Sequence, residues 1–240
     1  MPKYLVPYNN FHDLLEADSL DHLVVRTQRL VEVLGLDKFV FGGYPALAEP
    51  GCDPLIMGSY PLAWQERYRQ LQFQAIDPCV RHFRTSLYPV VWTPGFFAEP
   101  AALSMLEEAR CHGIFSGITC PAPLSSLGYF CLSVTNGDNI ETSAPHMAER
   151  VAEIHLLCSF FLEAFRSMRH EAITTVELTA RERQCLSLAA IGCRDSEISE
   201  KLRISVRTVV FHLNNARRKL AASNRSQTIA RGIALGVVIP

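Results

Sequence analysis

The sequence predicts an α+β protein in two parts. Residues 1–168 are expected to form an α/β/α sandwich with an antiparallel sheet, residues 169–176 a linker, and residues 177–240 a small all-α domain of four helices. Three observations indicate this: short aromatic or β-branched runs closed by Gly, Pro or Asn, flanking segments with apolar residues at helical spacing, and a change of charge near residue 176.

The first part alternates helical and strand-like segments. Residues 11–35 have apolar residues at helical spacing and end at Gly35, which predicts a helix over this range. Residues 99–113 predict a second helix, which stops at Gly113. The strand-like runs are KFVFGGYP, LIMGSYP, GIFSGITCP and YFCLSVTN, which begin at residues 38, 55, 113 and 129.

A long amphipathic helix is expected to close the first part. Over residues 142–168 the apolar side chains recur at steps of three or four, and Ser143 with Pro145 supplies a start signal. The polar stretch RHEAITTVE that follows has no strong period, so we interpret it as the linker.

The composition indicates a soluble protein without a membrane span or a metal site. With 48% hydrophobic and 20% charged residues, the chain has an ordinary soluble composition. No apolar run approaches the roughly 18 residues of a membrane span, and no basic and apolar leader opens the sequence, so we expect a cytoplasmic protein without membrane contact. The eight cysteines form no C-x-x-C pair, which favours reduced, mostly buried thiols and neither a metal site nor a cofactor.

The near-neutral total of −1 conceals an asymmetry of charge. Residues 176–240 carry 11 Lys/Arg and 5 Asp/Glu, a net charge of +6, whereas residues 1–175 carry 12 and 19, a net charge of −7. An acidic body with a basic tail indicates contact with a polyanion through the tail. A basic surface that is merely solvated is the alternative.

Four short helices are expected in the tail. Thr179 and Glu182 form a capping-box pattern that opens a helix ending at Gly192, and DSEISEKL at 195–202 is the second helix. Ser205 is expected to cap the third helix, 206–220, and NRSQTIARGIALG forms the fourth.

The third helix of the tail has the composition of a DNA-recognition helix. Residues 203–220 hold five cationic side chains and no carboxylate, and a short helix with a tight turn precedes them, as in a helix-turn-helix. On a helical wheel Val206, Val209, Leu213, Ala216 and Leu220 fall on the inward arc. The residues we expect to contact bases or phosphates are Arg203, Ser205, Arg207, Thr208, Val210, Phe211, Asn214, Asn215, Arg217 and Arg218.

The tail resembles the LuxR-type DNA-binding domain along its whole length. The elements L-T-x-R-E, A-x-G, E-I-x-x-x-L, S-x-x-T-V-x-x-H and K-L-x-x-x-N-R all appear at the family's spacing. Two positions depart from the family pattern. Cys193 stands where the family usually has Lys, and Val210 stands where it often has Lys or Asn.

Residues 60–92 contain the candidate ligand site of the first part. Trp64 and Tyr68 are four residues apart, a spacing that is common for a pair packed in the core. Asp77 lies in the apolar context QAIDPCV, and a buried carboxylate needs hydrogen-bond donors from the protein or from a ligand. Aromatic side chains beside one acid indicate an apolar pocket with a few orienting polar groups.

Residues 10–165 also resemble a known family domain, the autoinducer-binding domain of quorum-sensing LuxR-type regulators. Y-P-x-x-W-x-x-x-Y, I-D-P, a Trp and G-I-x-S-G-I-T occur in the family's order. The resemblance implies a transcriptional regulator and not an enzyme, with an N-acyl-homoserine lactone as its ligand. Its implied ligand-binding residues are Tyr60, Trp64, Tyr68, Asp77, Pro78, Trp92, Gly117 and Cys131.

The resemblance also implies a role for each of these residues. Trp64 would donate to the lactone carbonyl, Asp77 would accept from the amide N–H, and Tyr68 would donate to the acyl carbonyl, with Tyr60 as a further polar contact. Trp92 would pack on the lactone ring, Gly117 would leave room for the ligand, and Pro78 would shape the turn that aims Asp77. Cys131 replaces the family's frequent Ser or Thr with a weak donor, and the fatty tail is expected near Met105 and Phe130.

Ligand-coupled folding and dimerisation are the expected mechanism. The filled protein would form a homodimer through the 142–168 helix and the last helix, bind an inverted repeat in double-stranded DNA, and have RNA polymerase as a candidate partner. A relative tuned to another small signal, such as a plant metabolite or a pyrone, remains the alternative. A phosphorylated receiver lacks its acidic pair in this sequence, and the adjacent Cys111 and His112 have no orienting partner for a hydrolase.

Overall fold

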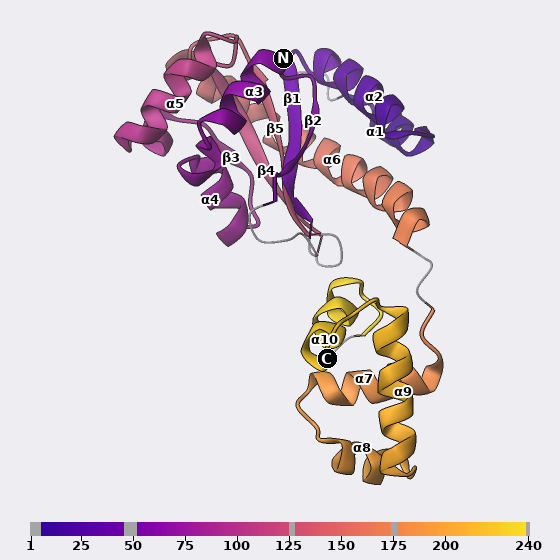
Figure 1. The fold of residues 1–240 in the computed structure, drawn as a ribbon. Coiled ribbons are helices and arrows are strands. Elements are labelled where there is room, and N and C mark those ends of the chain that lie inside the picture. The colour runs from indigo at the N-terminus through magenta and orange to yellow at the C-terminus, as the bar shows by residue number, and fades with distance from the viewer. Residues whose placement is uncertain (1–5, 46–51, 125–127, 174–176, 239–240) are drawn as a thin grey trace. The chain divides into compact units, whose positions relative to one another are not determined.

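Residues 6–45, 52–124, 128–173 and 177–238 are described by a computed structural model of the chain. They divide into two units, of which the first extends to Met168 and the second begins at Arg169 (Figure 1). The first unit is an antiparallel sheet with helices on both faces, as predicted, and the second is all-α. Within these described ranges, no helix is long and apolar enough to cross a membrane.

The sheet has five strands in the order β2-β1-β5-β4-β3. β1 pairs antiparallel with β2, Val40 opposite Gly58, and β3 pairs antiparallel with β4, Val90 opposite Thr119. Since side chains alternate along a strand, each strand contributes to both faces. The strands are β1 (Lys38–Pro45), β2 (Leu55–Gly58), β3 (Val90–Val91), β4 (Ser116–Leu124) and β5 (Gly128–Asn136).

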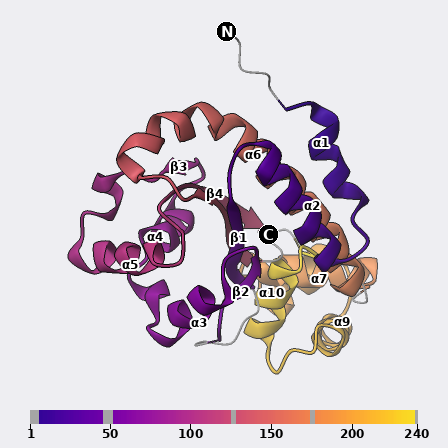
Figure 2. The ribbon, with the colours of Figure 1, turned by 90° about the horizontal axis from the view of Figure 1, so that it is seen from above.

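One face of the sheet is covered by α1 (Tyr8–His12), α2 (Leu20–Val33) and α6 (Ile140–Ile173), as Figure 2 shows. An aromatic cluster fills this layer. The ring of Phe41 lies 5.0 Å from that of Phe130, 4.8 Å from Phe161 and 4.9 Å from Phe165, between centroids. The expectation that Phe130 lies beside a ligand's tail is therefore wrong, because its side chain packs on this face.

The opposite face carries α3 (Leu62–Gln70), α4 (Pro78–Thr85) and α5 (Pro100–Arg110), visible on the other side of β1 in Figure 2. The side chains between these helices and the sheet form a second, separate core. Its largest members are aromatic: Tyr60, Trp64, Phe73, Trp92 and Phe97. This layer contains the cavity described below.

Two predicted helices have different bounds. The segment 11–35 is interrupted: the 3-10 turn η1 (Asp13–Glu16) is followed by extended backbone, and α2 begins only after Ser19, whose hydroxyl accepts the His22 N–H. Gly35, with φ +75°, ends it as expected.

The long helix α6 starts before and ends after its predicted range. It begins at Ile140 because the Asn139 side chain accepts the backbone N–H of Glu141 at 2.9 Å, so Pro145 lies inside the helix. It also continues to Ile173, into the stretch 169–176 that was predicted as linker.

The second unit packs four helices around two small apolar clusters. They are α7 (Ala180–Ala190), α8 (Asp195–Leu202), α9 (Val206–Lys219) and α10 (Arg225–Ala234). Leu186, Ala216 and Leu220 anchor one cluster, and Cys185 and Val209 anchor the other. These bounds follow the sequence prediction closely, but Val206 is not inward: it is 45% exposed at the first turn of α9.

Candidate functional site

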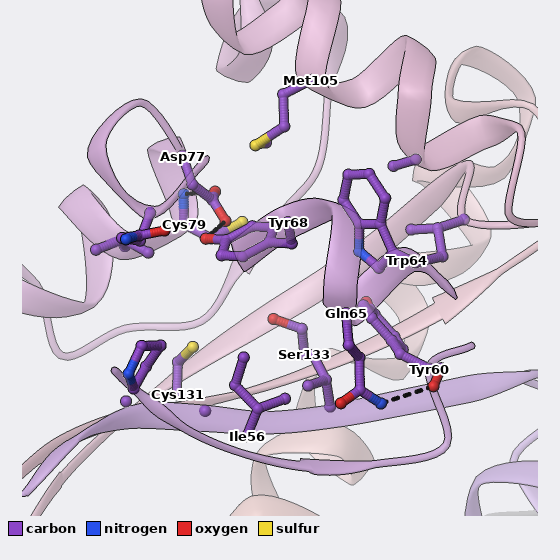
Figure 3. A pocket seen from close by; sticks show the side chains of 18 of the residues that line it. Ile56, Tyr60, Trp64, Gln65, Tyr68, Asp77, Cys79, Met105, Cys131 and Ser133 are labelled. Atoms are coloured by element: carbon purple, nitrogen blue, oxygen red, sulfur yellow. Dashed lines mark hydrogen bonds between the residues drawn. The ribbon is translucent and has the colours of Figure 1, made fainter. Parts of the chain in front are cut away.

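A cavity of about 110 Å³ lies between the sheet and helices α3, α4 and α5 of the first unit. Its wall is mainly apolar and is drawn from strands and helices that are distant in sequence (Figure 3). The apolar lining includes Val40, Ile56, Val80, Phe83, Phe97, Met105, Leu106, Ala109 and Ile114. Such a volume can hold a small, mostly apolar molecule oriented by a few polar groups.

The cavity brings together six of the eight ligand-binding residues expected from the sequence. Those that line it are Tyr60, Trp64, Tyr68, Asp77, Trp92 and Cys131. The lining does not include Pro78 or Gly117.

Asp77 is held in place by the start of α4. As the N-cap residue, its Oδ1 accepts the backbone N–H of Cys79 at 2.7 Å, and Pro78 occupies the first helical position, where its fixed φ suits a helix start. Its Oδ2 accepts the hydroxyl of Tyr68 at 2.8 Å. Burial raises the pKa of Asp77, although these hydrogen bonds act against the shift. The carboxylate oxygens keep further acceptor capacity for a donor in the cavity.

Trp64 and Tyr68 are both core residues and cavity residues. Trp64 is 5% exposed, and its ring meets Tyr68 edge-on at 5.9 Å and Phe73 at 5.7 Å. The indole N–H of Trp64 makes no hydrogen bond to any described residue, and Figure 3 shows its nitrogen on the side of the cavity. An indole N–H usually has a partner when buried, so this donor is available to a ligand.

The indole N–H of Trp92, in contrast, is already hydrogen-bonded within the protein. Its Nε1–H donates to Thr119 Oγ1 at 2.9 Å, and that hydroxyl is bonded to Ser133 Oγ at 2.8 Å. Gly117 makes the close packing of this ring with the sheet feasible. A Cβ there would lie 2.7 Å from the Val134 carbonyl oxygen and 3.3 Å from Trp92 Cδ2. The space that Gly117 leaves is therefore occupied by the protein's own side chains.

Ser133 was missed by the sequence reasoning. It follows Cys131 by two residues on β5, so both side chains face the cavity, and both line it. Burial raises the pKa of the Cys131 thiol, which keeps it neutral and a weak donor. Ser133 therefore supplies the hydroxyl that Cys131 lacks, one alternation further along the strand. The period of two in YFCLSV would have been sufficient to find it.

Other buried polar atoms near the cavity have no hydrogen-bond partner. They are Gln74 Oε1 and the hydroxyls of Tyr60 and Thr135, which lie near each other. Burial raises the pKa of Tyr60 well above its usual value, although Thr135 acts to lower it, so the phenol stays protonated. Tyr60 and Gln74 line the cavity, as does Gln65, whose Nε2 donates to the Tyr60 carbonyl oxygen at 2.8 Å. A buried polar atom without a partner is costly, which favours a ligand that supplies the missing partners.

The second candidate site is the outward face of α9. Ser205 caps the helix by accepting the Thr208 N–H at 3.1 Å, and Arg203 adopts φ +53° in the tight turn before it. The expected DNA-contacting residues that are exposed are Arg203, Ser205, Arg207, Val210, Phe211, Asn214, Arg217 and Arg218, while Thr208 and Asn215 are half-buried. α9 presents three arginines and no acid along an accessible face, and Arg203 adds a fourth from the turn before it.

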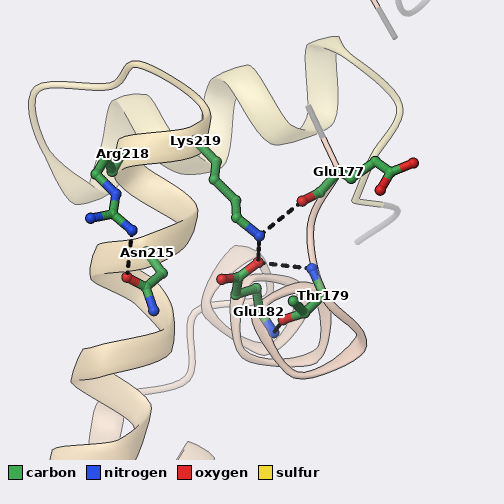
Figure 4. Close-up of polar contacts among 6 residues, drawn as sticks. All are labelled: Glu177, Thr179, Glu182, Asn215, Arg218 and Lys219. Carbon is green, nitrogen blue, oxygen red and sulfur yellow. Dashed lines mark hydrogen bonds and ion pairs between the residues drawn. The ribbon is translucent and has the colours of Figure 1, made fainter. Parts of the chain in front are cut away.

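Lys219 does not belong to that face. Its Nζ donates to Glu182 Oε2 at 2.7 Å and to the Glu177 carbonyl oxygen at 2.9 Å, as Figure 4 shows. Glu182 also accepts the Thr179 N–H, which completes the predicted capping box. Burial acts to raise the pKa of Glu182, but the hydrogen bonds from Lys219 and Thr179 hold it below its usual value. Lys219 thus fixes α9 on α7.

An apolar cavity with few polar groups, joined in one chain to a helix-turn-helix with a cationic outer helix, defines a ligand-responsive DNA-binding regulator. Comparison with known proteins agrees. Residues 19–165 match the autoinducer binding domain, and residues 176–231 match the bacterial regulatory proteins of the luxR family. The chain belongs to this LuxR family of quorum-sensing transcriptional regulators, which are not enzymes.

Relatives cover nearly the full chain. The transcriptional activator protein VanR of Vibrio anguillarum is 30% identical over 94% of both chains. RpaR of Rhodopseudomonas palustris, a quorum sensing-dependent transcriptional regulator, is 29% identical over 95% of this chain and 93% of its own. The crystal structure of Escherichia coli SdiA shares the fold, with a TM-score of 0.77 over 97% of both chains at 23% identity.

Proposed function

We propose that this regulator binds an N-acyl-homoserine lactone in the cavity, dimerises and then binds an inverted-repeat promoter site. The observation that carries the ligand class is the combination of an acceptor, Asp77, with an unpartnered donor, Trp64, in a mainly apolar cavity. An acyl-homoserine lactone offers one amide N–H, carbonyl oxygens and an apolar tail. Asp77 would accept the amide N–H, Trp64 would donate to the lactone carbonyl, and the tail would lie along the apolar lining.

The acyl carbonyl needs a donor of its own. Tyr68 has a single hydroxyl proton and gives it to Asp77, so it cannot donate to the ligand at the same time. The Tyr60 hydroxyl has only Thr135 near it, and Ser133 can donate to a ligand or to the Cys131 sulfur when Thr119 donates to it. We therefore assign the acyl carbonyl to Tyr60 and Ser133, with Tyr68 holding Asp77 in position.

Ligand binding would stabilise the first unit and so control dimerisation. Each unpartnered buried polar atom costs about 1–3 kcal/mol, and a ligand that binds only the folded state stabilises it by mass action. The dimer would form through α6 and α10 and present two α9 helices to half-sites roughly 34 Å apart. RNA polymerase is the candidate partner at the promoter.

Mass spectrometry of the co-purified ligand tests this proposal. The full chain is expressed in cells supplied with a panel of acyl-homoserine lactones, purified and extracted with organic solvent. We expect one lactone in stoichiometric amount, which is lost in Asp77→Asn and Trp64→Phe. Leu62→Ala is the matched control, since Leu62 lies on the same helix as Trp64 but is 81% exposed.

The result that contradicts the proposal is equally specific. The lactone assignment is contradicted if the folded full-length protein carries no lactone. It is also contradicted if the Asp77→Asn and Trp64→Phe variants carry as much lactone as the wild type. In the first case the extract would be searched for a plant metabolite or a pyrone, which is the alternative signal class. The family assignment does not depend on this outcome.

A further inference from the structure

Two exposed apolar side chains interrupt the polar face of α9. Val210 is 41% exposed and Phe211 is 60% exposed, next to each other in the first half of the helix. Neither residue belongs to the clusters that hold α9 on α7 and α8. Their exposure is therefore not explained by the packing of this unit, and it calls for a partner outside it.

The neighbours of these two side chains indicate which partner fits. At about 100° per residue, Val210 falls between Arg217 and Asn214 on the helix surface, and Phe211 falls beside Arg218. The apolar atoms are thus surrounded by guanidinium and amide groups, and the helix carries no carboxylate. The major groove of DNA is complementary to this arrangement, because phosphates line its edges and base edges lie at its floor.

We propose that Val210 and Phe211 read the 5-methyl groups of thymine, so that each half-site of the operator contains a thymine recognised without any hydrogen bond. Thymine is the base that presents a methyl group in the major groove, and aliphatic or aromatic side chains are its usual partners. The inference rests on DNA binding by α9.

The helix geometry also restricts where the thymine lies. Val210 follows Arg207 by three residues, a rise of about 4.5 Å along the helix axis. Base pairs are spaced about 3.4 Å apart. The thymine should therefore lie within about two base pairs of the base that Arg207 contacts.

Deoxyuridine substitution tests the inference, because it removes only the methyl group. A duplex is first enriched from a random library with the full chain, purified from cells supplied with the lactone panel. Each thymine is then replaced by deoxyuridine in both half-sites, and Kd is measured by fluorescence anisotropy at constant salt. We expect one or two positions at which Kd rises about fourfold for each methyl group lost, the value for removing one buried methyl.

Protein variants connect that effect to the two residues. For each sensitive thymine, we compare the Kd of the deoxyuridine duplex with that of the thymine duplex. This ratio should fall close to one in the variant, Val210→Ala or Phe211→Ala, that lacks the side chain contacting that thymine. Ile191→Ala is the matched control: Ile191 is also 60% exposed, but it lies at the end of α7, and its variant should keep the ratio.

Three results would overturn the inference. The first is an enriched duplex in which no thymine is sensitive to loss of its methyl group. The second is a sensitivity that persists in both α9 variants, and a change in the sedimentation of free Phe211→Ala protein would then assign Phe211 to a protein contact. If no duplex is enriched at all, DNA binding itself is contradicted, and this outcome is distinct from the other two.

Discussion

Ser133 is the residue whose role depends most on its neighbours. Thr119 accepts the Trp92 indole N–H, so its single proton can go either to Ser133 or to the Cys79 sulfur, which lies 3.3 Å away. When Thr119 donates to Ser133, the Ser133 proton can point into the cavity or toward the Cys131 sulfur. The hydrogen-bonded series Trp92, Thr119 and Ser133 thus orients one hydroxyl donor toward a ligand carbonyl.

Removal of this donor should weaken ligand binding selectively. In Ser133→Ala we expect the Kd of the recovered lactone to rise about tenfold, since a hydrogen bond to a buried carbonyl contributes about 1–1.5 kcal/mol. Isothermal titration of the full chain measures it. Cys131→Ala is the control on the same face of β5 and should change Kd by less than about threefold, because a thiol is a weak donor. A larger effect at Cys131 than at Ser133 would reverse the assignment.

At the residue scale, sequence reasoning succeeded where a side chain's chemistry is conspicuous. Asp77 in an apolar stretch predicted a carboxylate in need of donors, and Tyr68 supplies one of them. Ser133 was missed because a serine in a strand is unremarkable until the facing of the strand is known. The place of Gly117 could not be read from the sequence either, since only the fold brings Trp92 and Val134 against it.

At the scale of elements, caps explain both the successes and the failures of prediction. Three helices of the second unit, α7, α9 and α10, begin with the side-chain caps Thr179, Ser205 and Asn224, and their bounds were predicted closely. α3 buries only Trp64 and starts after Pro61 without a side-chain cap, so it has neither an apolar stripe nor a start signal. Its helical form depends on tertiary packing around the cavity.

The contact between α7 and α9 carries a prediction about pH. The Glu182 side chain is 4% exposed, and Lys219 is its ionic partner at 2.7 Å. Because the pKa of Glu182 is held below its usual value in the folded state, its charge contributes stability that is fully present above the unfolded pKa of about 4.3 and is lost as pH falls through the folded pKa. At neutral pH, Glu182→Gln should destabilise the second unit by about 2 kcal/mol.

Urea unfolding followed by circular dichroism at pH 7 and pH 3.5 checks this. The difference in unfolding free energy between wild type and Glu182→Gln should be smaller at pH 3.5 than at pH 7. Glu163→Gln is the control, because Glu163 forms an exposed ion pair with Arg166 on α6 and such pairs contribute little. An equal difference at both pH values would show that the charge of Glu182 is not what matters.

For the molecule as a whole, the two units have separate cores and opposite charge. The cavity layer is built from α3, α4 and α5 against the sheet, whereas the second unit packs its four helices on one another. The net charge is −7 before residue 176 and +6 from there on, so the attraction for DNA resides in the second unit and falls with salt. The ligand cavity and the DNA-binding helix thus belong to two units with separate cores.

Separate cores predict separate unfolding transitions. In calorimetry of the full chain we expect two transitions. The recovered lactone should raise only the one that tryptophan fluorescence also reports, since Trp64 and Trp92, the two tryptophans of the chain, both lie in the first unit. At a free lactone concentration of 100 Kd, the first unit should gain about 2.7 kcal/mol, while the second transition stays in place. Asp77→Asn should abolish the shift without moving the second transition. A lactone-dependent shift of both transitions would instead show that the units are energetically coupled, and control of DNA binding would then be exerted within one chain as well as through dimerisation.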